Sequence, residues 1–183
     1  MIDLEVQQEL GRAKNAIQDF FIRKLLVPKI YLDADWNGEH LEVLAIDRAG
    51  VGDVHAVHII SQAPDLTPHP VNESILVLGN EGFIRSLDEL KGISGHFRYL
   101  AALMAGSRSR EYYAGSSLLQ KTLSKDGVGR IGILFVDLVG KESAVNLVVR
   151  PERYRSTPEM VEFTDQFVAR HTANWEVRDP AEQ

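Results

Sequence analysis

The stretch KIYLDADWNGEHLEVLAID, from Lys29 to Asp47, constrains the fold of this chain more than any other part of its sequence. It contains two runs in which apolar and polar residues alternate, and Asn37 and Gly38 separate them. Asn-Gly favours a two-residue hairpin turn because both residues accept a positive φ. The stretch therefore predicts an antiparallel β-hairpin.

The segments around this hairpin predict the other elements. Apolar residues recur every three or four positions over residues 3–26, which predicts a helix that ends before Pro28. The turn RAGVG then leads into DVHAVHII, which predicts a third strand. After it we expect an irregular loop (61–73) and a short strand or buried apolar run (74–80). The elements expected further on are helices from a capping box at Ser86 to Gly92, over 94–106 and over 116–125, strands at 130–138 and 143–150, and a last helix capped by Thr157.

This order predicts an α/β (α+β) fold in which a central mixed β-sheet, opened by the antiparallel hairpin, is flanked by helices. The 183 residues fit a single domain over 1–175, followed by a frayed tail over 176–183. The sequence holds no internal repeat and no linker that would separate two domains.

Composition restricts the class of protein and its expected location in the cell. The hydrophobic share of 44% and charged share of 25% are those of a globular protein, and no cysteine is present. The apolar runs are shorter than the roughly 20 residues that span a bilayer, and the N-terminus does not resemble a signal peptide. We expect a soluble, cytoplasmic protein without membrane contact.

A net charge of −6 disfavours a protein whose whole surface binds polyanions. It leaves room for a local basic strip, and such a strip is a candidate nucleic-acid-binding site. The alternative is that these charges only solvate the surface. The strip consists of Arg108, Arg110, Lys121, Lys125 and Arg130.

Asp47 and His58 are the candidate site residues nearest the hairpin. Asp47 closes the second strand, and His58 lies near the end of the third, on the opposite face from His55. Pairing through the RAGVG turn would put Asp47 near the turn and His58 toward the far end, so their contact depends on the strand register. Alternatively, Asp47 accepts backbone hydrogen bonds in its turn, and His58 is a half-buried histidine without chemistry.

The leading helix, the hairpin with an aspartate near the end of its second strand, and a third strand after a Gly-rich turn together resemble the PD-(D/E)xK nuclease-like superfamily. The resemblance covers roughly residues 9–62 and is one of fold. It implies a restriction-endonuclease-like fold. It also implies a site in which a strand Asp and a (D/E)xK motif hold Mg²⁺ and place a lysine near the attacking water.

In this resemblance Asp47 matches the family aspartate, His58 stands at the acidic position and Ile60 at the lysine position. Ile60 can neither activate water nor bind a phosphate oxygen, and histidine prefers softer metals than Mg²⁺. We therefore expect a scaffold that has lost nuclease activity, needs no cofactor and binds nucleic acid or protein. The alternative is a Mg²⁺-dependent nuclease with a rearranged site of Asp47, Glu9 and Gln62, in which Asp47 and His58 are the candidate metal ligands.

Two further possibilities remain open at this stage. Lys29 could take the role of the missing lysine in place of Gln62. The chain could also be an assembly module, in which the first helix or an edge strand forms a homodimer contact.

Overall fold

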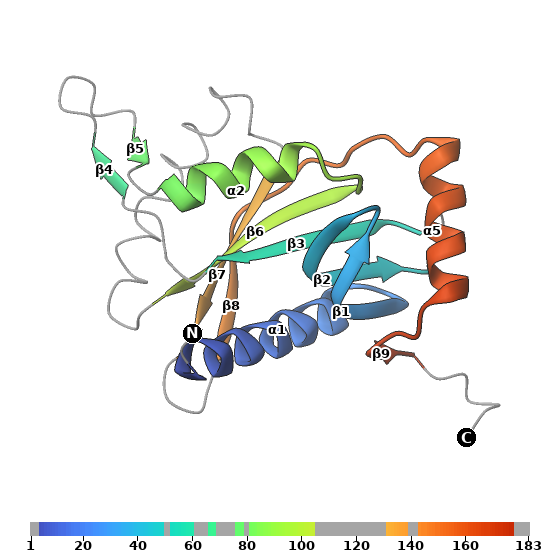
Figure 1. The fold of residues 1–183 in the computed structure, drawn as a ribbon, viewed down its shortest axis with the longest axis horizontal. Helices are drawn as coiled ribbons and strands as arrows, with labels where there is room; N and C mark the ends of the chain where they lie inside the picture. Colours follow the sequence, from blue (N-terminus) through green and yellow to red (C-terminus); the bar gives the residue numbers. More distant parts are fainter. Residues whose placement is uncertain are drawn as a thin grey trace.

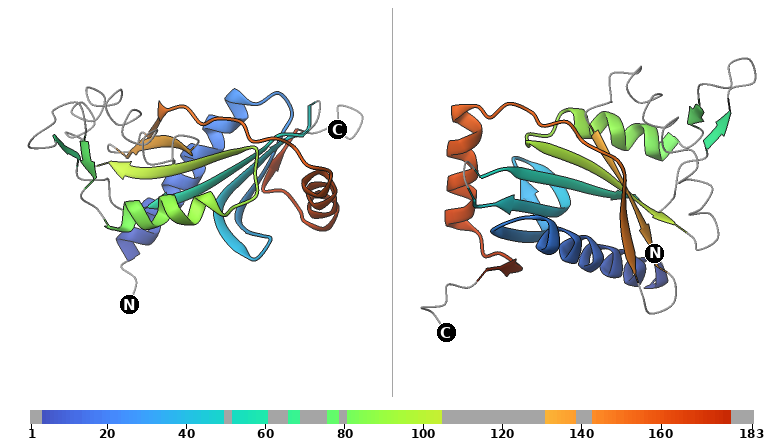
Figure 2. Two further views of the ribbon diagram at one scale, coloured as in Figure 1. Left: turned by 90° about the horizontal axis from the view of Figure 1, so that it is seen from above. Right: turned by 180° about the vertical axis from the view of Figure 1, so that it is seen from behind.

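The computed structural model describes residues 4–49, 52–60, 66–68, 76–78, 81–104, 131–138 and 143–177. They form an α+β fold with a mixed sheet flanked by helices, as the sequence predicts, and this sheet has seven strands (Figure 1). Helix α1 (Leu4–Lys24) covers one face, and helices α2 (Glu81–Lys91) and α5 (Pro158–Arg170) cover the other (Figure 2). The strand order is β8-β7-β6-β3-β2-β1-β9.

The strands of the large sheet are β1 (Pro28–Trp36), β2 (Glu39–Asp47), β3 (Val54–Ile60), β6 (Phe97–Met104), β7 (Ile131–Asp137), β8 (Ala144–Val149) and β9 (Trp175–Glu176). The short strands β4 (Leu66–Pro68) and β5 (Leu76–Leu78) pair separately. β1, β2 and β3 are antiparallel, whereas β3, β6 and β7 run parallel and β8 is antiparallel to β7. The sheet therefore joins an antiparallel half to a parallel half at β3.

The predicted hairpin is confirmed, and its turn residues Asn37 and Gly38 have φ values of 53° and 82°. Asp33 also has a positive φ, of 51°, in the middle of β1. Beyond Asp33 the strand presents a different face, because Ile30 packs under α1 whereas Trp36 packs in the core under α2 and α5. The Trp36 indole N–H donates to the carbonyl of Ser94 (2.7 Å), so the hairpin tip is held against the α2/α5 side.

The helix predicted over 94–106 is wrong, since Phe97–Met104 form strand β6. β6 lies between two parallel neighbours, and its residues enter both cores: Leu100 lies on the α2/α5 side and Tyr99 on the α1 side. A strand buried on both faces is apolar almost throughout, and such a run also satisfies a helical spacing. The predicted start of α2 is wrong as well, because the helix begins at Glu81 instead of at a cap on Ser86.

Several other predictions are confirmed. β7 and β8 form from the two predicted β-rich runs, and α5 begins at Pro158 with Thr157 as its cap, whose hydroxyl accepts from the backbone N–H of Met160 (3.2 Å). Glu176, assigned to the frayed tail, pairs with Lys29 in the sheet. The helix predicted over 116–125 lies outside the described residues. Within the described ranges, no helix is both long and apolar enough to cross a membrane.

Candidate functional site at the two ends of the β2–β3 pair

Asp47 lies at the turn end of the β2–β3 pair, where its carboxylate accepts three backbone hydrogen bonds. The donors are the N–H groups of Val27 (3.0 Å), Ala49 (3.1 Å) and Leu26 (3.2 Å). The Asp47 backbone N–H in turn donates to the carbonyl of Asp53 (2.9 Å). The side chain therefore ties the connection between α1 and β1 to the turn that follows β2.

The electrostatics of Asp47 follow from these contacts. Burial raises the pKa of the carboxyl group, but the hydrogen bonds from Val27, Ala49 and Leu26 outweigh it and leave the pKa below its ordinary value. The carboxylate is thus held in its charged form by donors from the protein itself. This arrangement matches the alternative in which Asp47 accepts backbone hydrogen bonds in its turn.

His58 lies at the other end of the pair and does not face Asp47. The register runs from Ile46↔Val54 to Val43↔Val57, so the residue opposite His58 is Glu42. Asp47 is five residues further along β2, about 17 Å away along the strand. Strand alternation also directs Asp47 toward the α1 side and His58 toward the α2/α5 side, so the two candidate metal ligands are not brought together.

Glu42 and His58 meet where β2 and β3 part, at a place we call the strand fork (Glu42, His58 and Ile59). The Glu42 Oε2 lies 3.1 Å from His58 Nδ1 and accepts the backbone N–H of Ile59, also at 3.1 Å. Pairing of β2 with β3 ends at Val43, while β3 continues beside β6 as far as Ile60. The Glu42 carboxylate therefore supplies Ile59 with the acceptor that a further residue of β2 would otherwise give.

The strand fork orients an imidazole. The contact between Glu42 Oε2 and His58 Nδ1 fixes which ring nitrogen faces the carboxylate. The side chains of Glu42 and His58 are 16% and 14% exposed, so solvent reaches both to a limited extent. The geometry therefore offers a carboxylate that holds an imidazole in one orientation at a partly exposed place.

The imidazole of His55, on the same strand, is buried among aromatic side chains instead of facing a carboxylate. Its ring stacks on Phe97 (4.7 Å between centroids), and Nδ1 lies 3.1 Å from the Tyr99 hydroxyl. Burial, together with the nearby charge of Lys24, lowers the pKa of His55 to about 3. His55 is therefore neutral at physiological pH and belongs to the packing under α1, on the opposite face from His58 as the alternation predicts.

The remaining candidates lie apart or outside the described residues. Glu9 is exposed on the first half of α1, whereas Asp47 binds Leu26 just beyond its other end, about 25 Å away along the helix. Gln62 lies outside the described residues. In the ranges that the structure describes, no three or more His, Cys, Asp or Glu side chains gather as a metal site.

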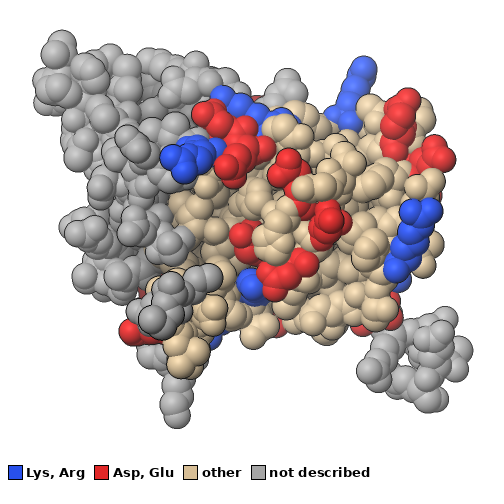
Figure 3. Space-filling model, in the orientation of Figure 1, with Lys and Arg blue, Asp and Glu red and all other residues tan. Residues whose placement is uncertain are grey.

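The whole basic strip also lies outside the described residues. It comprises Arg108, Arg110, Lys121, Lys125 and Arg130. On the face drawn in Figure 3, the Lys and Arg side chains of the described part are scattered among acidic ones and form no continuous basic patch. Lys29, the alternative to the missing lysine, pairs with Glu176 (3.2 Å) at the β1–β9 edge.

Glu42 is the residue that the sequence analysis missed. Its position depends on how many residues the turn after β2 leaves unpaired, and this number sets which residue of β2 faces His58. If Ile46 is taken to pair with Val54, counting one residue at a time along both strands away from the turn places Glu42 opposite His58. The sequence offers no other signal for Glu42. Comparison of the chain with family models, curated proteins and solved structures found no match.

Proposed function

We propose that this protein acts by binding a nucleic acid or another protein and does not hydrolyse phosphodiester bonds. The observation that carries the proposal is that both oxygens of the Asp47 carboxylate accept backbone N–H groups, Oδ1 from Val27 and Ala49 and Oδ2 from Leu26. A carboxylate that holds Mg²⁺ directs its lone pairs at the cation. At Asp47 three of the about four lone pairs accept backbone N–H groups instead.

The order of the elements supports a restriction-endonuclease-like scaffold for this role. α1 covers one face of the antiparallel strands β1 to β3, and α2 then crosses the other face to β6, which is parallel to β3. Ile60, at the position that the resemblance gives to lysine, packs against the core under α2 and α5. An aliphatic side chain there supports a scaffold without its water-activating amine.

One observation favours a second candidate function, a nuclease with a rearranged site. Glu42 faces His58, so a carboxylate does lie opposite the third-strand position that the resemblance assigns to an acid. In this alternative Glu42 takes the role first assigned to Asp47. The donor set fits Mg²⁺ poorly, because Oε2 already accepts the N–H of Ile59 and imidazole is a ligand for softer metals.

A cleavage assay tests both candidates. Purified protein is incubated with plasmid and linear DNA in the presence of Mg²⁺ or Mn²⁺, and we expect no cleavage above background. Metal-dependent cleavage that persists in Asp47→Asn and is lost in Glu42→Gln would establish the rearranged nuclease. Cleavage lost in a folded Asp47→Asn variant would make Asp47 a catalytic ligand, and either result would overturn the proposal.

The salt dependence of DNA binding identifies the class of partner. A protein that contacts phosphates releases counterions, so its affinity falls linearly with salt on a log–log scale. A steep slope for the full chain would assign nucleic acid as the partner. Absence of measurable DNA binding at low salt would assign the binding role to a protein partner.

A further inference from the structure

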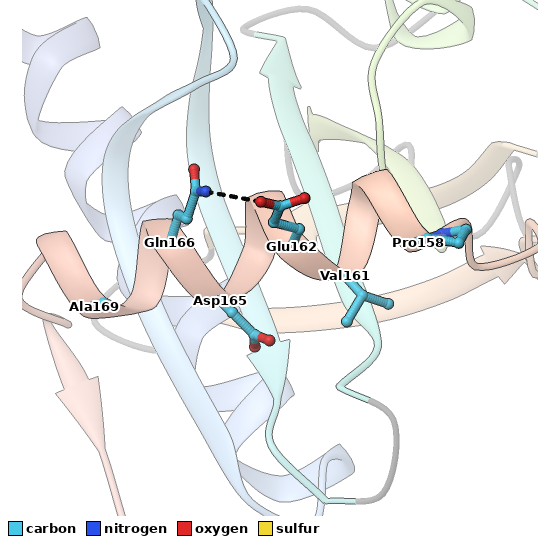
Figure 4. A pocket seen from close by; sticks show the side chains of 6 residues that line it. All are labelled: Pro158, Val161, Glu162, Asp165, Gln166 and Ala169. Atoms are coloured by element: carbon cyan, nitrogen blue, oxygen red, sulfur yellow. Dashed lines mark hydrogen bonds between the residues drawn. The ribbon is translucent and has the colours of Figure 1, made fainter.

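The outward face of α5 carries a shallow hollow of about 610 Å³ (Figure 4). Its lining residues recur at intervals of three or four positions and so form one stripe along the helix, roughly 17 Å long. Both apolar and acidic or polar side chains contribute. They are Pro158, Val161, Glu162, Asp165, Gln166 and Ala169, and we call this set the α5 stripe.

The opposite face of α5 holds the helix firmly on the domain. Phe167 is buried against Tyr31 and Trp36, with ring centroids 5.0 Å and 5.1 Å apart, and Phe163 also packs on Trp36 (4.7 Å). Thr164 is buried as well, and its hydroxyl donates to the carbonyl of Met160 (2.7 Å). The α5 stripe is therefore a rigid platform on which Val161 remains 41% exposed.

Both charged side chains of the α5 stripe, Glu162 and Asp165, are acidic. In Figure 4, Glu162 and Gln166 extend to one side of the helix and Val161 and Asp165 to the other, so each side carries one carboxylate. Asp165 forms an exposed ion pair with Arg48 (3.3 Å), of the kind that contributes little stability. A second copy docked face to face would bring like charges together, whereas a cationic partner would complement them.

We infer that the α5 stripe docks an amphipathic helix of a partner protein, with lysine or arginine side chains beside its apolar face. The hollow is open and belongs to a single helix, whereas small-molecule sites enclose most of their ligand. A spacing of three and four residues is the one by which helices pack on each other. This inference extends the proposed binding role and is tested separately from DNA cleavage.

A peptide titration tests the inference on the full chain. The probe is a fluorescent 14-residue helical peptide of lysine and leucine, and its charge-reversed counterpart of glutamate and leucine is the peptide control. Fluorescence anisotropy is expected to show binding of the lysine peptide only. The double variant Glu162→Lys with Asp165→Lys is expected to lose at least tenfold in affinity, and Val161→Lys alone several-fold.

The matched control makes the same change of charge elsewhere on the molecule. Asp19 on α1 and Glu39 on the hairpin are both exposed, and the variant Asp19→Lys with Glu39→Lys is expected to lose no more than threefold. Equal losses in the two double variants would show general electrostatic attraction and overturn the inference. Absence of binding, or a dimer in sedimentation that Val161→Lys abolishes, would overturn it too. The proposed function would stand in each case if DNA is not cleaved.

Discussion

Each end of the β2–β3 pair holds a carboxylate and an imidazole, in different settings. At the turn end, Asp47 accepts backbone N–H groups only, and His55 is buried beside Tyr99 on the same face of the sheet. At the strand fork, the Glu42 carboxylate contacts the His58 imidazole directly, and both side chains stay partly exposed.

The difference shows that environment, and not residue type, determines which of these groups is available for chemistry. Backbone donors hold the pKa of Asp47 low and occupy its oxygens, and burial lowers the pKa of His55 to about 3. At the fork the strands have parted, so a side-chain carboxylate replaces the missing ladder partner and orients a ring nitrogen. At the turn end the carboxylate ties two connections of the chain together, whereas at the fork it holds an imidazole.

The largest expected effect is that of Asp47→Ala, which removes a charged acceptor from three backbone N–H groups. We expect the free energy of unfolding to fall by about 3 kcal/mol, measured by urea denaturation. The control Asp19→Ala, at an exposed helix position, is expected to change it by about 0.5 kcal/mol or less. A loss below about 1 kcal/mol for Asp47→Ala would contradict its structural role.

The next effect, compared per pH unit, is acid sensitivity caused by His55. Its pKa is lowered from 6.5 to about 3, so between these values the unfolded chain binds a proton that the folded protein does not. Stability is therefore lost as the pH falls from 6.5 toward 3, by at most about 1.4 kcal/mol per pH unit. His55→Gln should flatten this slope and His40→Gln, at a side chain 60% exposed, should not. Identical slopes would refute the assignment.

Removing the carboxylate at the strand fork should lower the free energy of unfolding less than removing the carboxylate at the turn end. Glu42→Ala is expected to lower the free energy of unfolding by about 1–2 kcal/mol, because Ile59 and His58 lose one shared acceptor. Glu42→Gln keeps an acceptor oxygen and should lose less than about 1 kcal/mol. Amide hydrogen exchange at Ile59 should accelerate in Glu42→Ala, and unchanged protection there would argue against the fork.

The smallest effect is the coupling between the carboxylate and the imidazole at each end. A double-mutant cycle of Glu42 with His58 is expected to give about 0.5–1 kcal/mol, since the two side chains touch. The corresponding cycle of Asp47 with His55 should give less than about 0.3 kcal/mol, because His55 is neutral and bonds to Tyr99 instead. A larger coupling energy for Asp47 with His55 than for Glu42 with His58 would contradict this difference between the two ends.

The predictions that the structure confirms rest on local signals. Asn37-Gly38 defines the hairpin turn, and Thr157 with Pro158 defines the start of α5, because turn and cap preferences act over a few residues. The sequence predicts a helix in place of β6 because the burial of this strand on both faces comes from neighbours that are distant in the sequence. Sequence alone can show that a segment is apolar, but the parallel neighbours β3 and β7 decide its conformation.

The candidate site was predictable only in part, for the same reason. The opposite faces of His55 and His58 follow from strand alternation. The partners of Asp47 do not, since Leu26 and Val27 lie some 20 residues earlier in the chain and reach it only through the packing of α1. The place of Glu42 opposite His58 depends on the length of a turn, which no single residue specifies.

A carboxyl titration of Asp47 tests the central claim most directly. The carbon-13 shift of its side-chain carboxyl group, followed by NMR against pH with and without Mg²⁺, reports both its pKa and any metal contact. We predict a pKa below the ordinary value of 3.8 and a titration that Mg²⁺ leaves unchanged. An ordinary pKa together with a shift that depends on Mg²⁺ would show that Asp47 is free to bind the metal and would contradict the account.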